Sequence, residues 1–322
     1  MSKKEFFVNF GMDEDIVDKV KKYINSIKKS GYFKGKNNQK IYYEKYIIEN
    51  EKGRIVILHG FTECIVKYLE LIYYFTEEKY SVFIMEHRGH GRSGCLSVFD
   101  KTQVTVEDFN FYVEDIKKFI DKIVSKNNNK NMYLFAHSMG GAIGTMFLEK
   151  YPRYFDKAIL SSPMFNIAIG HIPIFLAKIM AKIAIIFGNG EKFIFGNMPY
   201  ESTYDFTIAS TSNESRYSFY YREILSHSEL QRGGGSFKWF YESLRGISYI
   251  LKKKNIKNIK IPVLILESGK DELVGNNISK KFLKRCKHCK VIIFKEAKHE
   301  LYLENNDILE EYIESIFKFL EN

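Results

Sequence analysis

Short runs of almost exclusively apolar residues recur along the whole chain and alternate with segments of helix length. Runs of this kind are typical of strands buried on both faces, as in a parallel sheet that is covered by helices. The alternation therefore predicts an α/β fold, with a mostly parallel central sheet and helices on both faces. The predicted strands are 42–48, 54–58, 81–85, 132–135, 158–160, 262–266 and 291–294.

The segments between these runs have the length and the apolar spacing of helices. The alternation stops at about Met164 and resumes after Gly233-Gly234-Gly235. We therefore expect an α/β core of residues 1–163 and 237–322, with a helical cap of residues 164–236 inserted over the C-terminal edge of the sheet. The predicted helices are 66–78, 106–125, 139–151, 237–252, 276–284 and 301–320, together with a charged helical segment at 1–30.

The composition supports a large buried core and excludes several classes of protein. Of the 322 residues, 45% are hydrophobic and 16% are aromatic, which argues against a disordered chain. The four cysteines are too few for a disulfide scaffold, so we expect reduced thiols and a cytoplasmic protein. Neither a signal peptide nor a membrane-spanning helix is predicted. The net charge of +10 favours anionic surfaces such as phospholipid.

The sequence Ala136-His137-Ser138-Met139-Gly140-Gly141 stands between a predicted buried strand and an apolar helix. A strand, a sharp turn and a helix form the context of a nucleophile elbow, which exposes the turn residue above the edge of the sheet. Small residues are needed on either side of the turn, because the two backbones crowd together there. Gly140 meets this need, and Ala136 stands where glycine is usual. We therefore predict that Ser138 is a catalytic nucleophile.

A serine hydroxyl at neutral pH needs a base to take its proton and an acid to orient that base. In a fold of this type the acid and the histidine come later in the chain, each in a loop after a strand. Asp271 and His299 each follow a predicted strand in this way. They are the predicted catalytic partners of Ser138, and Glu267 and Glu272 are rival acids in less suitable positions.

The negative charge that develops on the substrate oxygen needs two backbone N–H donors. The residue after the nucleophile should supply one of them, and here it is Met139. The other should come from the loop after the strand 54–58, which reads His59-Gly60-Phe61. We predict that Phe61 supplies the second N–H group of this oxyanion hole and that Gly60 lets the backbone approach.

Taken together, these motifs resemble the α/β-hydrolase group that contains bacterial lysophospholipases and monoacylglycerol lipases. The resemblance extends from about residue 55 to residue 305, with Glu86 where the group usually has Asp. It implies hydrolysis of a fatty-acyl ester, without a metal or an organic cofactor. The segments that carry it are His59-Gly60-Phe61, Glu86-His87-Arg88-Gly89-His90-Gly91-Arg92-Ser93-Gly94, the turn around Ser138, Ser161-Ser162-Pro163-Met164, Gly269-Lys270-Asp271 and His299-Glu300.

Other motifs fit other chemistries less well. The run Gly89-His90-Gly91-Arg92-Ser93-Gly94 matches a dinucleotide-binding pattern, but such a motif should open a helix at once and the next residues read as a loop. Cys286-Lys287-His288-Cys289 lacks the second ligand pair of a structural zinc site, so free or loosely paired thiols are expected. The aromatic residues fall in apolar patterns, so nucleic acid is not an expected partner. His87, His90 and His137 are expected to pack or to hydrogen-bond rather than to act as bases.

The predicted cap contains an apolar stretch from Ile167 to Phe187. It holds Lys178 and Lys182, which are four residues apart and so share one face of a helix. Two interpretations stay open: a cap helix packed over the site, or a helix in a membrane interface with its lysines near lipid phosphate. The two are compatible if the cap opens at a membrane, and an apolar cap over the site predicts a tunnel for an acyl chain.

The prediction is thus a serine carboxylic-ester hydrolase that releases a fatty acid from a lysophospholipid or a monoacylglycerol through an acyl-enzyme intermediate. We expect a cytoplasmic enzyme with a lipid ester as its substrate and peripheral contact with the inner face of the membrane. Two alternatives stay open. One is a peptidase or short-chain esterase on the same scaffold, and the other is a non-catalytic lipid-binding module.

Overall fold

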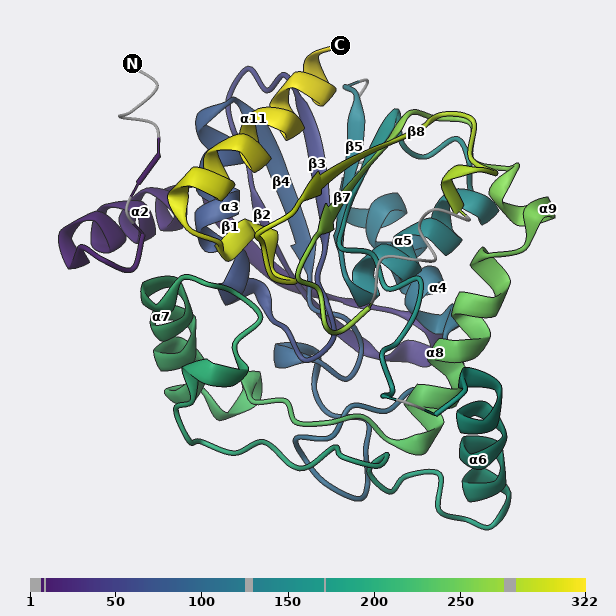
Figure 1. Cartoon of the computed structure of the whole chain (residues 1–322). Coiled ribbons are helices and arrows are strands. Elements are labelled where there is room, and N and C mark those ends of the chain that lie inside the picture. The colour runs from purple at the N-terminus through teal and green to yellow at the C-terminus, as the bar shows by residue number, and fades with distance from the viewer. Residues whose placement is uncertain (1–6, 9, 125–129, 171, 275–281) are drawn as a thin grey trace.

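The computed structural model describes residues 7–8, 10–124, 130–170, 172–274 and 282–322. Its centre is an eight-stranded sheet in the order β1-β2-β4-β3-β5-β6-β7-β8 (Figure 1). β2 pairs antiparallel with both β1 and β4, and all the remaining pairs, from β4 across to β8, are parallel, which confirms the predicted mostly parallel sheet. The strands are β1 (Lys28–Lys34), β2 (Lys40–Tyr46), β3 (Gly53–Leu58), β4 (Tyr80–Met85), β5 (Met132–His137), β6 (Lys157–Ser161), β7 (Val263–Ser268) and β8 (Cys289–Phe294).

Helices cover both faces of this sheet. Successive side chains of each central strand point to opposite faces, and they are buried in two different cores. Val56 and Leu58 of β3 belong to the core that contains α4, α5 and α8, whereas Ile55 and Ile57 belong to the core that contains α2, α3 and α11. The predicted layers are therefore confirmed. The helices are α2 (Glu14–Ile27), α3 (Leu69–Glu77), α4 (Asn110–Phe119), α5 (Met139–Lys150), α8 (Phe237–Ile250), α9 (Lys253–Ile256) and α11 (Asn306–Glu321).

The N-terminal segment differs from the prediction of one helix over residues 1–30. Helix α2 begins after Asp13, whose side chain accepts hydrogen bonds from two N–H groups of the first turn, and it ends at Ile27. Lys28–Lys34 then forms the edge strand β1. The sequence hides this strand because only Phe33 is buried in it, so the apolar run that marks the central strands is missing.

The other helices lie where they were predicted, with changes at their ends. A 3₁₀ turn at Ile65–Tyr68 precedes α3, and α4 passes into a π-helical turn at Ile120–Val124. Another 3₁₀ turn, Leu301–Leu303, precedes α11. The predicted helix 276–284 falls, up to residue 281, outside the described residues.

Residues 164–236 add no strand to the main sheet in the part of this segment that the structure describes. They contain α6 (Ile174–Ile186) and α7 (Glu214–Leu225), which lie on opposite sides of the lower end of the sheet in Figure 1. α6 packs against α8, and α7 packs into the core that contains α3. Among the described helices, none combines the length and the apolar character needed to cross a membrane.

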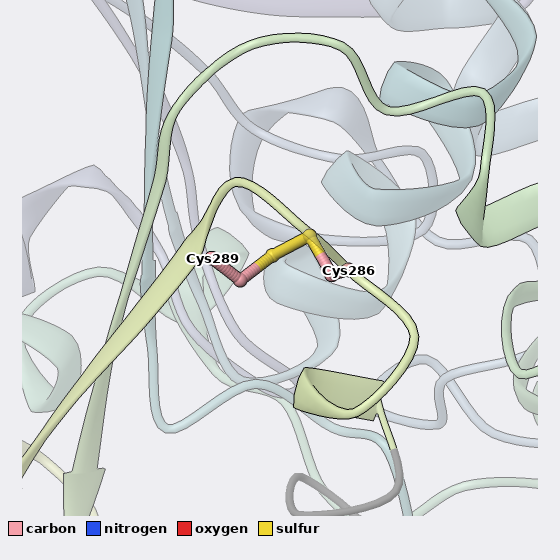
Figure 2. Close-up of a disulfide and its surroundings, with 2 residues drawn as sticks. All are labelled: Cys286 and Cys289. Atoms are coloured by element: carbon pink, nitrogen blue, oxygen red, sulfur yellow. A yellow bond between two sulfur atoms is a disulfide. The ribbon is translucent and has the colours of Figure 1, made fainter.

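The expectation that all four cysteines are reduced is wrong for one pair. Cys286 and Cys289 form a disulfide at the turn into β8 (Figure 2). The turn places their Cα atoms 5.5 Å apart, which is a normal separation for a disulfide. A spacing of three residues thus suits a short disulfide loop as well as half of a zinc site. Cys64 and Cys95 are free thiols.

One carboxyl group in α5 is buried without a partner. Glu149 is 2% exposed, and neither carboxylate oxygen has a hydrogen-bond partner among the described residues. Burial raises the pKa of Glu149 from 4.5 to about 9, so the folded protein holds this side chain protonated and neutral at pH 7. In the unfolded chain the same group is ionised at pH 7, and folding must therefore take up a proton there.

We predict that Glu149→Gln stabilises the protein at pH 7 and that the gain shrinks as the pH falls. The raised pKa of Glu149 costs folding free energy at every pH above 4.5, up to about 3 kcal/mol at pH 7, and a neutral amide does not pay this cost. The measurement is urea unfolding of both proteins at pH 5 and pH 7. Glu310→Gln, at an exposed position of α11, is the control and should change nothing. An equal effect of Glu149→Gln at both pH values would contradict the prediction.

Candidate active site

The chain makes a strained turn at Ser138, between β5 and α5. Its φ of 50° and ψ of −117° lie outside the regions that a non-glycine residue normally adopts. Two backbone hydrogen bonds hold the turn: the Ser138 N–H donates to Ser161 O at 3.0 Å, and the Met164 N–H donates to Ser138 O at 2.8 Å. The predicted strand, turn and helix are therefore present, and the segment Ser161–Met164 supports the turn from the neighbouring strand β6.

Glycines make room for this turn where the two backbones approach. A Cβ atom on Gly140 would clash with the backbone carbonyls of Leu58 and His59 at the end of β3. Ala136 stands where glycine is usual, and the structure shows how its methyl group fits. The facing residue on α5 is Gly144, whose missing Cβ would lie only 3.2 Å from the Ala136 Cβ. The extra methyl on the strand is thus matched by a missing one on the helix.

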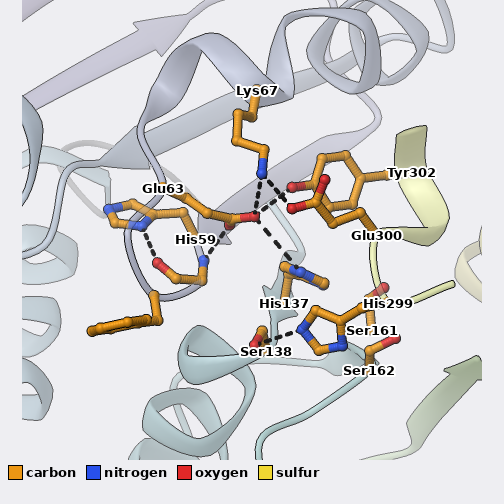
Figure 3. A network of polar contacts seen from close by, with 12 residues as sticks. His59, Glu63, Lys67, His137, Ser138, Ser161, Ser162, His299, Glu300 and Tyr302 are labelled. Atoms are coloured by element: carbon orange, nitrogen blue, oxygen red, sulfur yellow. Dashed lines mark hydrogen bonds and ion pairs between the residues drawn. The ribbon is translucent and has the colours of Figure 1, made fainter. Parts of the chain in front are cut away.

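His299 lies within hydrogen-bond distance of both of the other predicted catalytic side chains, Ser138 and Asp271. His299 Nε2 is 2.8 Å from Ser138 Oγ, and His299 Nδ1 is 2.7 Å from Asp271 Oδ2. Figure 3 shows the contact between the histidine ring and the serine. The side chains come from the loops after β5, β7 and β8, which meet at the C-terminal edge of the parallel strands. Their catalytic roles stay a prediction that this geometry favours.

Backbone groups fix the carboxylate that faces His299. The Leu273 and Val274 N–H groups donate to Asp271 Oδ1 at 2.9 and 3.1 Å, which leaves Oδ2 for the histidine. Burial alone would raise the pKa of Asp271, but the hydrogen bond from His299 and these two N–H groups lower it below its ordinary value. Asp271 is therefore ionised at neutral pH. The rival acids lie elsewhere: Glu267 within β7, and Glu272 on the surface.

The two predicted oxyanion donors, the N–H groups of Met139 and Phe61, make no hydrogen bond to any of the described residues. Met139 is the first residue of α5, where an N–H group has no partner within the helix. The Phe61 N–H donates to none of the described groups, whereas the neighbouring Gly60 N–H donates to Glu63 Oε2 at 2.5 Å. Met139 directly follows Ser138 in the chain, and the assignment of Phe61 and Met139 to the oxyanion hole stays a prediction.

The histidines next to the motifs are buried and neutral. Burial lowers the pKa of His59 to about 4 and that of His137 to about 3, and it also lowers the pKa of His87 and His90. His59 Nε2 accepts a hydrogen bond from the His87 N–H at 2.9 Å, so its proton lies on Nδ1, which is 2.8 Å from Gly60 O. The rings of His59, His87 and His90 contact backbone carbonyl groups, whereas His137 packs against the rings of His299 and Tyr302. His299 is the imidazole that contacts Ser138.

A largely apolar cavity of about 400 Å³ opens beside the serine. Its described lining contains Ser138 and Asn197 as the polar members, and the remainder is mostly aliphatic and aromatic. Phe61 and Trp239 form one wall, with ring centroids 4.0 Å apart. The contribution of α8 to this wall was not predicted, because nothing in the local sequence links residue 239 to residue 61.

The other motifs do not form cofactor or metal sites in the structure. Gly89, Gly91 and Gly94 have positive φ angles and shape an irregular loop, and α4 begins only at Asn110. A dinucleotide-binding motif would open a helix directly, so the loop does not fit one. Among the described residues, no group of three or more His, Cys, Asp or Glu side chains could hold a metal ion.

Comparison with known families identifies the chain. The family model described as serine aminopeptidase S33 matches residues 49–306, which span the whole site described above. The chain belongs to this family of α/β-hydrolases. Its fold and the order of Ser138, Asp271 and His299 agree with that membership.

Relatives with curated names match almost the full length of the chain. A probable lysophospholipase L2 from Haemophilus influenzae is 30% identical over 292 residues, which cover 90% of this chain and 91% of that protein. Lysophospholipase L2 from Escherichia coli K12 is 27% identical and covers 89% of this chain and 86% of that protein. A monoglyceride lipase from Saccharomyces cerevisiae, solved with a substrate analogue, superposes with a TM-score of 0.72 at 20% identity over 91% of this chain and 94% of that one. This last likeness shows the fold.

Proposed function

We propose that this enzyme hydrolyses fatty-acyl esters of glycerol lipids, either lysophospholipids or monoacylglycerols, through an acyl-enzyme on Ser138. The observation that carries the proposal is the hydrogen-bonded chain from Asp271 through His299 to Ser138 at the wall of a largely apolar cavity. The names of the relatives from H. influenzae and E. coli agree with this chemistry.

In the proposed reaction, His299 Nε2 takes the proton of the Ser138 hydroxyl as the oxygen attacks the ester carbonyl. The negative charge on the carbonyl oxygen is held by the N–H groups of Met139 and Phe61. Asp271 keeps the proton of His299 on Nδ1 and stabilises the imidazolium. His299 then gives its proton to the leaving glycerol oxygen. Water attacks the acyl-enzyme in the second half of the reaction and releases the fatty acid.

The cavity favours a long acyl chain over a peptide. An aminopeptidase must bind the positively charged amino group of its substrate, and a carboxylate is the usual partner for such a group. The described residues that line the cavity include no Asp or Glu. An apolar chain gains free energy by leaving water in such a cavity. The intact hydrogen-bonded chain at Ser138 likewise argues against a non-catalytic lipid-binding module.

We further propose that residues 164–236 act as a cap that also contacts membrane lipid. In α6 the small side chains of Ala177, Ala181 and Ala184 pack against the core, whereas large apolar side chains point outward. Phe175 is 61% exposed and Ile186 is 69% exposed. A water-facing helix normally has the opposite arrangement. The exposed apolar face of α6 consists of Ile174, Phe175, Leu176, Ile179, Met180, Ile183 and Ile186.

This face is continuous with the cavity. Met180 belongs to the face and also lines the cavity, and the exposed side chains of Ile172 and Phe195 line the cavity as well. A lipid could therefore pass from a bilayer to Ser138 without crossing water. The cap also carries Lys178 and Lys182, which together with the net charge of +10 favour anionic lipid. This contact should weaken as salt is added.

We predict that Ser138→Ala lowers the turnover of a long-chain monoacylglycerol by at least about a thousandfold, because it removes the nucleophile. The variant should also lose labelling by a fluorophosphonate probe, while its unfolding temperature stays unchanged. Ser243→Ala is a matched control, since Ser243 is buried in α8 and its hydroxyl has no partner among the described residues.

A panel of long-chain lysophospholipid, long-chain monoacylglycerol, acetate ester and aminoacyl anilide separates the candidate activities of this enzyme. We expect turnover of the two lipids to exceed that of the anilide and the acetate. Retained turnover by folded Ser138→Ala contradicts the proposed nucleophile, and a preference for the aminoacyl anilide favours the peptidase.

We predict that replacing Ile179 and Ile183 together with serine lowers the fraction bound to phosphatidylglycerol vesicles at least about fivefold. The two side chains are 50% and 49% exposed, and each loses the gain from burial in the interface. Ile293→Ser is the control: this isoleucine of β8 is 48% exposed and lies outside the cap. Cosedimentation at low and high salt is the measurement. Equal binding of the double variant and the control would exclude α6 as the membrane contact.

A further inference from the structure

Charged and polar side chains lie buried beside the loop that runs from His59 to Glu63 (Figure 3). Glu63 is 4% exposed, Lys67 is 8% exposed and Glu300 is 6% exposed. Charged groups are rarely buried to this extent, and when they are, they are paired. We call this group the Glu63 cluster; its members are Glu63, Lys67, Tyr68, His137, Glu300 and Tyr302.

Four donors converge on the carboxylate of Glu63. Oε2 accepts hydrogen bonds from the Gly60 N–H at 2.5 Å and from the Tyr68 hydroxyl at 2.6 Å. Oε1 accepts a hydrogen bond from the Tyr302 hydroxyl at 2.7 Å, and Lys67 Nζ lies 3.3 Å from it. Burial alone would raise the pKa of Glu63, but Lys67 and the two tyrosine hydroxyls help to lower it below its ordinary value. The carboxylate is therefore ionised.

The cluster joins the loops that carry the proposed catalytic groups. Gly60 belongs to the loop after β3. Glu300 directly follows His299, and Tyr302 lies in the same segment. Lys67 Nζ is hydrogen-bonded to the Glu300 carboxylate. His137, the residue before Ser138, has its ring centroid 4.8 Å from that of His299 and its Nε2 atom 3.7 Å from Glu63 Oε1. Glu63 is thus the common partner of three segments that are far apart in the sequence.

The contacts at Gly60 determine where the Phe61 N–H group points. Glu63 fixes the N–H of the peptide before Gly60, and His59 Nδ1 fixes the carbonyl of the peptide after it, at 2.8 Å. In a trans peptide the C=O and the N–H point in opposite directions. When Gly60 O is held by His59, the Phe61 N–H must therefore point away from His59. Glycine is the most flexible residue, so without both contacts this orientation is easily lost.

We propose that Glu63 is a positioning residue for the oxyanion hole: its carboxylate fixes Gly60 and so keeps the Phe61 N–H directed at the substrate oxygen. Through Tyr302, Lys67 and Glu300 it also sets the distance between this loop and the loop of His299. A buried ion pair of this kind adds little net stability, because removing the charges from water offsets most of the attraction. The inference rests on the proposed function of Ser138.

The test compares two buried glutamates that have the same kinds of partner. Glu44 on β2 is 5% exposed, accepts hydrogen bonds from the hydroxyls of Tyr42 and Tyr46, and has Lys28 Nζ at 4.0 Å. It has no contact with the proposed catalytic residues. Glu63→Gln and Glu44→Gln therefore remove the same charge from similar surroundings. Glu63 lies beside the loop of Gly60 and Phe61, and Glu44 lies near the edge of the sheet.

For Glu63→Gln we expect kcat to fall about 10- to 100-fold, which is part of the loss caused by removing an oxyanion donor, while KM changes less than about twofold. The affinity for a trifluoromethyl ketone with the same acyl chain should fall by the same factor as kcat/KM, because its tetrahedral adduct carries the oxyanion. The affinity for the fatty acid product should stay unchanged. Glu44→Gln should leave all of these quantities at the wild-type value.

Wild-type kcat in folded Glu63→Gln overturns the inference, and so does an equal fall in both variants. If Glu63→Gln does not fold, Tyr302→Phe and Tyr46→Phe form the deciding pair, since each removes one hydroxyl donor from one of the two carboxylates. We then expect kcat to fall about threefold or more in Tyr302→Phe only, and equal kcat values overturn the inference. Turnover by Ser138→Ala would instead overturn the proposed function itself.

Discussion

The strained backbone at Ser138 is the constraint on which the rest of the site depends. A positive φ at a non-glycine residue costs about 1–3 kcal/mol, and it persists only where the surroundings hold it. Here Ser161 at the end of β6 and Met164 in the segment after it hold the turn, and glycines on α5 allow the helix to start directly above β3. The turn exposes the hydroxyl at the edge of the sheet and starts α5 at Met139. The proposed nucleophile and one of the two proposed oxyanion donors are thus products of the same local geometry.

A second constraint is that the loops around this turn must keep their positions although they lie far apart in the sequence. Parallel strands bring their ends to one edge, but the side chains that fix the loops are polar and buried. Asp271 is held by two N–H groups of its own loop, whereas the loop of Gly60 and the loop of His299 are both held through Glu63. On the outer side of the site the exposed apolar face of α6 is not covered by any of the described residues, which fits a contact with lipid.

The sequence was sufficient to predict most strands of the sheet, because strands that are buried on both faces consist of clear apolar runs. It also placed Ser138, Asp271 and His299 in loops after strands, and the structure brings these three side chains together. It was insufficient where local residues look ambiguous. β1 was missed because an exposed edge strand has no apolar run, and the disulfide was missed because a spacing of three residues fits several kinds of site.

Contacts between residues that are far apart in the chain also could not be predicted from the sequence. Examples are the contacts of Phe61 with Trp239 and of Glu63 with Tyr302. A charged pair four residues apart within an apolar segment, as at Glu63 and Lys67, is the signal that could have revealed the second contact.

The most direct test of the whole account is a crystal structure of the enzyme inactivated by a long-chain alkylphosphonate. The account predicts phosphorus on Ser138 Oγ, its oxygen within about 3 Å of the Phe61 and Met139 amide nitrogens, and the alkyl chain in the cavity beneath α6. Phosphorus on another residue, or an oxygen turned away from both amides, would contradict it.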